Sequence, residues 1–152
     1  MGKQKTKSNK RIVDGITFKS DLEVYMYNCL KEAGIKSGYE THRYTLLPAF
    51  KYTEMCLEKT KGGKIMKDSR TVRAITYTPD FVDVEEEWII ETKGWENDSF
   101  PLRWKLFKQL MISRSNPPLL FKPKTRKECD QVISILLSKG YGKSKKQRLV
   151  KG

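Results

Sequence analysis

Three side chains near the middle of the chain have the types and spacing of a site that hydrolyses phosphodiesters. Asp80 follows Pro79 in an extended segment, and Glu91 and Lys93 lie two residues apart in an apolar segment that we predict to be a strand. Because side chains alternate along a strand, Glu91 and Lys93 share a face, about 6–7 Å apart along it. Pairing of the two segments would bring Asp80 beside Glu91. Two carboxylates can bind Mg²⁺ through their oxygens, and a lysine can orient or help to deprotonate an attacking water, or stabilise developing charge.

Glu23 is a candidate third carboxylate of this group. It lies on a helix predicted over 17–33, about 20° from Leu30 in projection, because seven residues advance by about 100° each. It therefore leans toward the buried side of the helix. Its alternative role is to close a capping box with Ser20, three residues before it. Asp80 could instead belong to an ordinary Thr-Pro-Asp turn. Glu91 and Lys93 could instead form an exposed ion pair of small energetic value. The residues alone leave both interpretations open.

The charge of the chain indicates a polyanionic partner. The sequence holds 31 Lys and Arg against 18 Asp and Glu, which gives a net charge of +13. Each of the tails 1–11 and 140–152 carries five bases and no acid. We expect these tails to be flexible and attracted to nucleic-acid phosphates, with an acidic membrane surface as the second possibility. Residues 80–98 carry eight acids and one base, whereas 99–127 carry eight bases and no acid. A metal-dependent enzyme acting on a phosphate backbone needs both, carboxylates for the cation and bases for the strand.

Several classes of protein are excluded by composition. No apolar run approaches the roughly 18–20 residues of a membrane span, and no apolar stretch of a signal peptide follows the basic start. Three scattered cysteines and a single histidine argue against a disulfide framework, a Cys-x-x-Cys zinc site and His-based catalysis. The interpretation is a cytoplasmic, intracellular protein with no membrane partner.

The hydropathy pattern predicts one α/β domain over 12–139, between the two tails. The segments with helical periodicity are 17–33, 99–112 and 125–140, with Ser99 as the N-cap of the second. The segments predicted as strands are 39–46, 75–84, 88–93 and 119–122, with further extended segments around a hairpin turn at Gly62-Gly63.

Four short stretches resemble, in the same order, those of a known nuclease family. They are Phe18-Lys19-Ser20-Asp21-Leu22-Glu23, Gly34-Ile35-Lys36, Tyr77-Thr78-Pro79-Asp80-Phe81 and Ile90-Glu91-Thr92-Lys93-Gly94-Trp95. Pro79-Asp80 together with Glu91-Thr92-Lys93 matches the PD-(D/E)xK nuclease signature. The four stretches together resemble the phage endonuclease I family of Holliday-junction resolvases, over about residues 16–115.

This resemblance implies a PD-(D/E)xK, restriction-endonuclease-like core with a central mixed β-sheet flanked by helices. It implies dependence on Mg²⁺ or Mn²⁺, an intertwined homodimer, and cutting of branched DNA such as a four-way junction, by a phage-encoded protein acting in a bacterial host. Glu23, Asp80 and Glu91 would be the metal-site carboxylates, and Lys93 the catalytic lysine. The chain departs from the family at 49–73, which we predict to be an insertion with a hairpin, and at 122–152, which has no counterpart.

Further bases are candidates for gripping the DNA backbone. Bases at the start of the last predicted helix oppose its dipole, so helix stability does not explain them. A solvated basic face is the alternative. The candidate DNA-binding residues are Lys19, Lys105, Lys108, Arg114, Lys122, Lys124, Arg126 and Lys127. Trp95 could be a core residue or a wedge against bases, and its neighbours do not distinguish the two.

Two other functions share these features. A nicking, flap or sequence-specific nuclease would keep the same catalytic group and change the substrate. A non-enzymatic nucleic-acid-binding protein would use Asp80 and Glu91 as structural charges only. Cleavage that depends on a divalent cation would separate the nucleases from the binding protein.

Overall fold

The computed structural model describes residues 11–59, 62–63, 65–66 and 71–142. Its elements are β1 (Arg11–Val13), β2 (Ile16–Phe18), α1 (Asp21–Glu32), β3 (Ser37–Tyr39), β4 (Tyr44–Leu47), β5 (Phe50–Lys51), β6 (Glu58–Lys59), β7 (Ile65–Met66), β8 (Thr71–Val72), β9 (Ile75–Tyr77), β10 (Phe81–Asp83), β11 (Trp88–Ile90), α2 (Phe100–Ile112), β12 (Leu119–Phe121) and α3 (Arg126–Ser138). The predicted basic tails lie outside the described residues, apart from Arg11 and 140–142. In the described part of the chain, no helix has the length and apolar character that crossing a membrane requires.

A four-stranded mixed sheet lies at the centre, in the order β12-β11-β10-β3. Strand β11 runs parallel to β12 and antiparallel to β10, which is antiparallel to β3. In the central pair, Phe81 lies opposite Ile90 and Val82 opposite Ile89. The predicted α/β class, with a mixed sheet flanked by helices, is confirmed.

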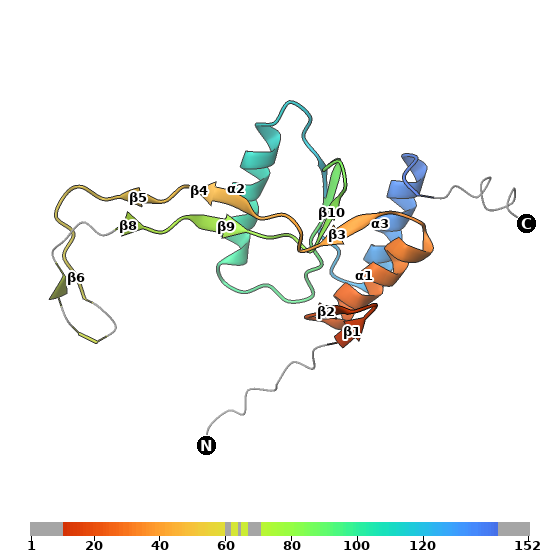
Figure 1. The fold of residues 1–152 in the computed structure, drawn as a ribbon, viewed down its shortest axis with the longest axis horizontal. Coiled ribbons are helices and arrows are strands. Elements are labelled where there is room, and N and C mark those ends of the chain that lie inside the picture. Colours follow the sequence, from red (N-terminus) through yellow and green to blue (C-terminus); the bar gives the residue numbers. More distant parts are fainter. Residues whose placement is uncertain (1–10, 60–61, 64, 67–70, 143–152) are drawn as a thin grey trace, which may run out of the picture.

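Alternating side chains give this sheet two apolar faces. Phe81, Trp88 and Ile90 pack into a core with residues of α1 and α3. Val82 and Ile89 point the other way and pack against α2. Figure 1 shows α1 and α3 together on one side of the sheet and α2 on the other. Strand β11 is buried on both faces, as is typical of a sheet that helices cover on both sides. Its carboxyl end therefore holds the residues that follow it in a fixed position.

The helix predicted over 17–33 begins later, at Asp21. The residues before it form the β1–β2 hairpin, which we did not predict. Its turn, Asp14-Gly15, has positive φ at both residues (50° and 76°), the conformation for which Asp-Gly is favoured in two-residue hairpins. That dipeptide was the available signal.

The start of α2 is held differently from the prediction. Ser99 occupies the N-cap position but makes no capping hydrogen bond with its side chain. Instead, Oδ1 of Asn97 accepts hydrogen bonds from the backbone N–H of Phe100 (3.0 Å) and from the Ser99 hydroxyl (3.1 Å).

Two predicted strands are each divided in two. The segment 39–46 contains the end of β3 and most of β4, separated by residues 40–43, where Glu40 has a φ of 50°. The segment 75–84 contains β9 and β10, separated by residues 78–80. At 40–43 the chain passes from the central sheet into the separate β4–β9 pair, and at 78–80 it returns from that pair to the central sheet. The two breaks lie side by side, because the backbone N–H of Glu40 donates to the carbonyl of Asp80 (2.8 Å).

Beyond the β4–β9 pair the chain continues as a two-stranded ribbon that projects from the domain (Figure 1). Strand β5 pairs with β8 and β6 with β7, so the predicted hairpin around Gly62-Gly63 is confirmed. The ribbon and its base carry exposed apolar side chains, which are Leu47, Phe50, Tyr52, Met55, Leu57 and Val72.

Candidate active site

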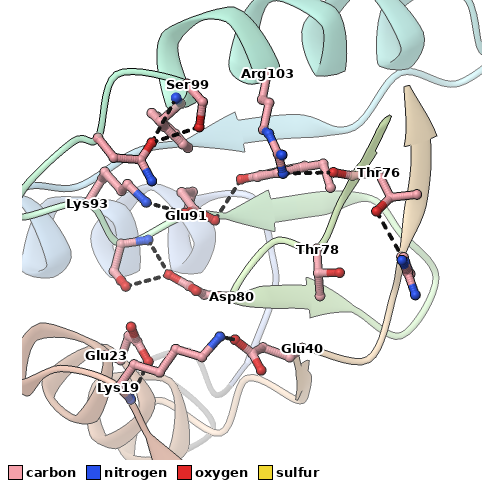
Figure 2. Close-up of a pocket in the computed structure, with 15 residues that line it drawn as sticks. Lys19, Glu23, Glu40, Thr76, Thr78, Asp80, Glu91, Lys93, Ser99 and Arg103 are labelled. Carbon is pink, nitrogen blue, oxygen red and sulfur yellow. Dashed lines mark hydrogen bonds and ion pairs between the residues drawn. The ribbon is translucent and has the colours of Figure 1, made fainter. Parts of the chain in front are cut away.

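A cavity of about 430 Å³ opens where β10 begins and β11 ends (Figure 2). It is lined by side chains from both interrupted segments, from the start of α1 and from α2. Its acidic members are Glu23, Glu40, Asp80 and Glu91, and its basic members are Lys19, Arg43, Lys93 and Arg103. The four residues predicted to be catalytic therefore meet in one cavity.

Asp80 lies at the entrance to β10 and is 7% exposed. Its Oδ2 accepts hydrogen bonds from the backbone N–H of Thr92 (2.8 Å) and from the Thr92 hydroxyl (2.6 Å). Burial, followed by the negative charge of Glu91, raises the pKa of the Asp80 carboxyl to about 8. The hydrogen bonds from Thr92 thus orient the Asp80 carboxyl group, while burial and Glu91 disfavour its charged form.

Glu91 follows the last residue of β11 and is 5% exposed. We predicted that Glu91 and Lys93 lie within this strand, but β11 ends at Ile90. The chain nevertheless stays extended, because the N–H of Glu91 donates to the carbonyl of Phe121 (2.9 Å) and the N–H of Lys93 to that of Pro123 (3.0 Å). The two side chains therefore share a face, as the alternation predicted.

The Glu91 carboxylate is held between a tyrosine and a lysine. Its Oε2 accepts a hydrogen bond from the hydroxyl of Tyr77 (2.6 Å), and its Oε1 lies 3.5 Å from Nζ of Lys93. Burial raises the pKa of Glu91, while the Tyr77 hydrogen bond and the Lys93 charge act against that rise. Nζ of Lys93 also lies 4.3 Å from the ring centroid of Phe100, a cation–π contact.

Glu23 takes part in the cap of α1 and its side chain also lines the cavity. Its backbone N–H donates to Oγ of Ser20 (3.2 Å), which caps α1, and its Oε2 accepts from the backbone N–H of Lys19 (3.0 Å). The same Oε2 accepts a hydrogen bond from the hydroxyl of Tyr39 (2.6 Å). The side chain is 7% exposed and lines the cavity. The helix cap and the site are compatible because the start of α1 faces the edge of the sheet.

We expect Ser20→Ala to lower the free energy of unfolding by about 1 kcal/mol, because it removes the side-chain cap of α1. Ser20→Asn should remain close to the wild type, since asparagine is an equally good N-cap. Urea unfolding followed by circular dichroism measures both. Equal stabilities of the alanine variant and the wild type would show that the cap contributes nothing.

The donor set fits a divalent cation. Within the described residues, no three His, Cys, Asp or Glu side chains form a ready-made metal cluster. In Glu23 and Asp80, however, only one carboxylate oxygen accepts described hydrogen bonds, and the second oxygen of Glu91 lies beside Nζ of Lys93. Carboxylate oxygens are the ligands that Mg²⁺ prefers, and it keeps several waters, so two carboxylates are enough. A cation would also relieve the repulsion between Asp80 and Glu91. Asp80 and Glu91 would hold it, with Glu23 as the third candidate.

A family model described as "Protein of unknown function (DUF1064)" matches residues 3–115. The chain belongs to the DUF1064 family. The matched DUF1064 region contains every residue that lines the cavity, whereas β12 and α3 lie beyond it. No curated protein and no solved structure matches the chain.

Of the eight bases predicted to grip DNA, Lys19 alone lines the cavity, where its amine pairs with the Glu40 carboxylate. The other seven are not part of the cavity lining. Lys122 and Lys124 pair with Glu96, with Nζ to Oε1 distances of 2.7 Å and 3.9 Å. The remaining five are Lys105, Lys108, Arg114, Arg126 and Lys127.

Two arginines among those five contact side chains of other elements of the domain. Arg114 pairs with Glu86 (3.2 Å) and lies over the ring of Tyr44, whose hydroxyl donates to the same Glu86 oxygen (2.6 Å). Arg126 lies over the ring of Tyr25, 5.1 Å from its centroid. These contacts join separate elements, so the two arginines have structural roles whether or not they meet DNA.

Several residues of the DUF1064 region that shape the site had no signal in the sequence. Tyr39 and Tyr77 hold one oxygen of Glu23 and Glu91, and burial together with these hydrogen bonds raises the pKa of both hydroxyls, so they remain donors. Arg43 and Arg103 line the cavity although no motif marks them. Trp95, next to the site in sequence, is 90% exposed, which excludes the core role left open for it.

Proposed function

We propose that this protein is a metal-dependent DNA endonuclease with a PD-(D/E)xK core, acting on branched DNA and most specifically on four-way junctions. One observation carries the proposal. Asp80 and Glu91, two buried carboxylates, meet Lys93 in a single cavity whose other basic members are Lys19, Arg43 and Arg103. A structural ion pair does not account for two buried carboxylates that repel each other, whereas a divalent cation held between them would offset that repulsion.

The chain's own residues supply orientation and charge. Thr92 fixes Asp80, and Tyr77 fixes Glu91, so that one oxygen of each is kept in place while the other serves the cavity. Lys93 can donate its N–H groups to the attacking water or to the phosphate, where negative charge develops. A bound Mg²⁺ or Mn²⁺ would lower the pKa of water and neutralise phosphate charge. Together these account for hydrolysis of a phosphodiester.

The partner we propose is branched DNA, cut by a homodimer. A four-way junction needs two opposed cuts, which a two-fold axis relating two sites provides. Exposed apolar side chains on the ribbon, such as Phe50 and Met55, offer surface for contact between copies. Since the substrate is DNA and the resemblance is to phage enzymes, we propose action in the cytoplasm of a bacterial host.

The test is cleavage of three DNA substrates of matched sequence, a four-way junction, a linear duplex and a flap, with Mg²⁺, with Mn²⁺ and with EDTA. We expect paired cuts in the junction with either metal and none with EDTA. Cutting of all three substrates would keep the nuclease and remove the junction preference. Tight binding without cutting in any metal would overturn the enzymatic proposal in favour of a nucleic-acid-binding protein.

A further inference from the structure

We propose that Arg43 and Arg103 form a binding site for a backbone phosphate of the DNA strand that is cut, next to the scissile phosphate. This inference rests on the proposed function and adds the residues that hold the substrate. Arg43 precedes β4 and Arg103 lies on α2, so they are 60 residues apart in the chain. Both line the same cavity as the catalytic carboxylates.

The two arginines converge on a single residue of β9. Nε of Arg43 donates to Oγ1 of Thr76 (3.2 Å), and a terminal nitrogen of Arg103 donates to the backbone carbonyl of Thr76 (3.2 Å). Figure 2 shows Arg103 reaching down from α2 to Thr76, above the level of Asp80. Thr76 thereby ties both guanidinium groups to one residue of the cavity lining.

Most hydrogen-bonding capacity of the two arginines remains available. A guanidinium has five N–H groups, and each arginine uses one on Thr76. Among the residues that the structure describes, neither arginine makes an ion pair with a carboxylate. The planar fork of donors matches two oxygens of a phosphate, and such charge-assisted pairs are stronger than neutral hydrogen bonds.

The two arginines differ in their charge environment from the two lysines that line the cavity. Lys19 is paired with Glu40, and Lys93 lies beside Glu91, so each lysine has a carboxylate neighbour. In Figure 2 Lys19 and Glu40 lie on the opposite side of Asp80 from Arg103 and Thr76. A DNA strand bound across Asp80 and Glu91 would therefore meet, on the β9 side, the positive charge of the two arginines. The geometry points to this side as the place where a neighbouring phosphate is held.

The test replaces single phosphates of the junction by neutral methylphosphonates at each position near the cut. Wild type is compared with Arg43→Ala, Arg103→Ala and the control Lys139→Ala, which removes an exposed charge at the end of α3. Both kcat/KM for cleavage and Kd in EDTA are measured. We expect each arginine variant to weaken binding about tenfold, corresponding to about 1.4 kcal/mol, while the control stays near wild type.

The decisive result is non-additivity. At one phosphate beside the cut, the neutral substitution should cost the wild type at least about tenfold in Kd and cost each arginine variant clearly less, because part of the contact is already lost. An equal cost in wild type and variants at every position would overturn the proposal and leave the arginines as links between α2, β4 and β9. The binding measurement decides this even if the wild type does not cut, an outcome that would overturn the proposed function separately. Thermal melting of each variant verifies that the fold is retained.

Discussion

Replacement of Glu91 by alanine should reduce metal-dependent cleavage of a four-way junction by about 10³-fold or more. The substitution removes one of the two carboxylates proposed to hold the cation and also removes the partner of Lys93 (3.5 Å). Loss of one group that stabilises charge in a transition state typically costs about 10²–10³-fold, and the lysine loses its orientation as well. Single-turnover cleavage rates with saturating enzyme measure the effect on chemistry apart from binding.

The matched control is Glu85→Ala, which removes an exposed acid from the same acidic block at the β10–β11 turn, outside the cavity. Its cleavage rate should match the wild type. A Glu91→Ala protein that melts like the wild type and still cuts within tenfold of its rate would contradict the assignment of Glu91 to the site.

Replacement of Asp80 by asparagine should stabilise the metal-free protein by about 1–3 kcal/mol near pH 8, since each tenfold change in proton affinity corresponds to about 1.4 kcal/mol. The asparagine carbonyl can still accept the two hydrogen bonds from Thr92, while the buried charge beside Glu91 disappears. The same variant should fail to cut. A gain in stability together with a loss of activity is expected for a site in which two carboxylates that repel each other are kept close together for function.

The pH dependence of this gain follows from the raised pKa of Asp80. The carboxyl is protonated in the folded protein up to about pH 8 but ionises near its ordinary value of 3.8 once the chain unfolds. The wild type therefore loses stability as the pH rises from about 4 to 8. The difference between Asp80→Asn and the wild type should be small at pH 4 and largest at pH 8.

Thermal unfolding in EDTA across this pH range measures the difference, and a second series with Mg²⁺ tests the cation. Mg²⁺ should raise the Tm of the wild type at pH 8 and have less effect on Asp80→Asn, because a bound cation offsets the charge that the variant lacks. A variant less stable than the wild type at every pH would show that the Asp80 charge is compensated within the protein.

Features that depend on a local period were predictable from the sequence. The alternation of an extended chain placed Glu91 and Lys93 on one face, and the expected pairing of the two segments placed Asp80 beside Glu91. The spacing of Ser20 and Glu23 predicted the cap of α1, and the hydrogen bonds at the start of that helix confirm it. Each of these relations joins residues that are near in sequence or in adjacent strands, so backbone geometry alone fixes it.

The tertiary structure decided the features that depend on distant contacts. Continuous strands were predicted through 40–43 and 78–80, but the chain passes between the central sheet and the β4–β9 pair there, and the cavity is lined by residues from both breaks. Propensity favours strand throughout both segments, and the requirement to pair with two different sheets overrides it.

The supporting residues of the site likewise became visible only in three dimensions. Tyr77 reaches Glu91 across 14 residues, and Arg43 and Arg103 meet at Thr76 from separate elements. No periodicity connects such residues, because their distance is set by the packing of helices on the sheet. Residue types and local spacing were enough to indicate the candidate catalytic groups, whereas the packing of distant elements sets which carboxylate oxygens are held and which positive charges have no carboxylate partner in the described residues.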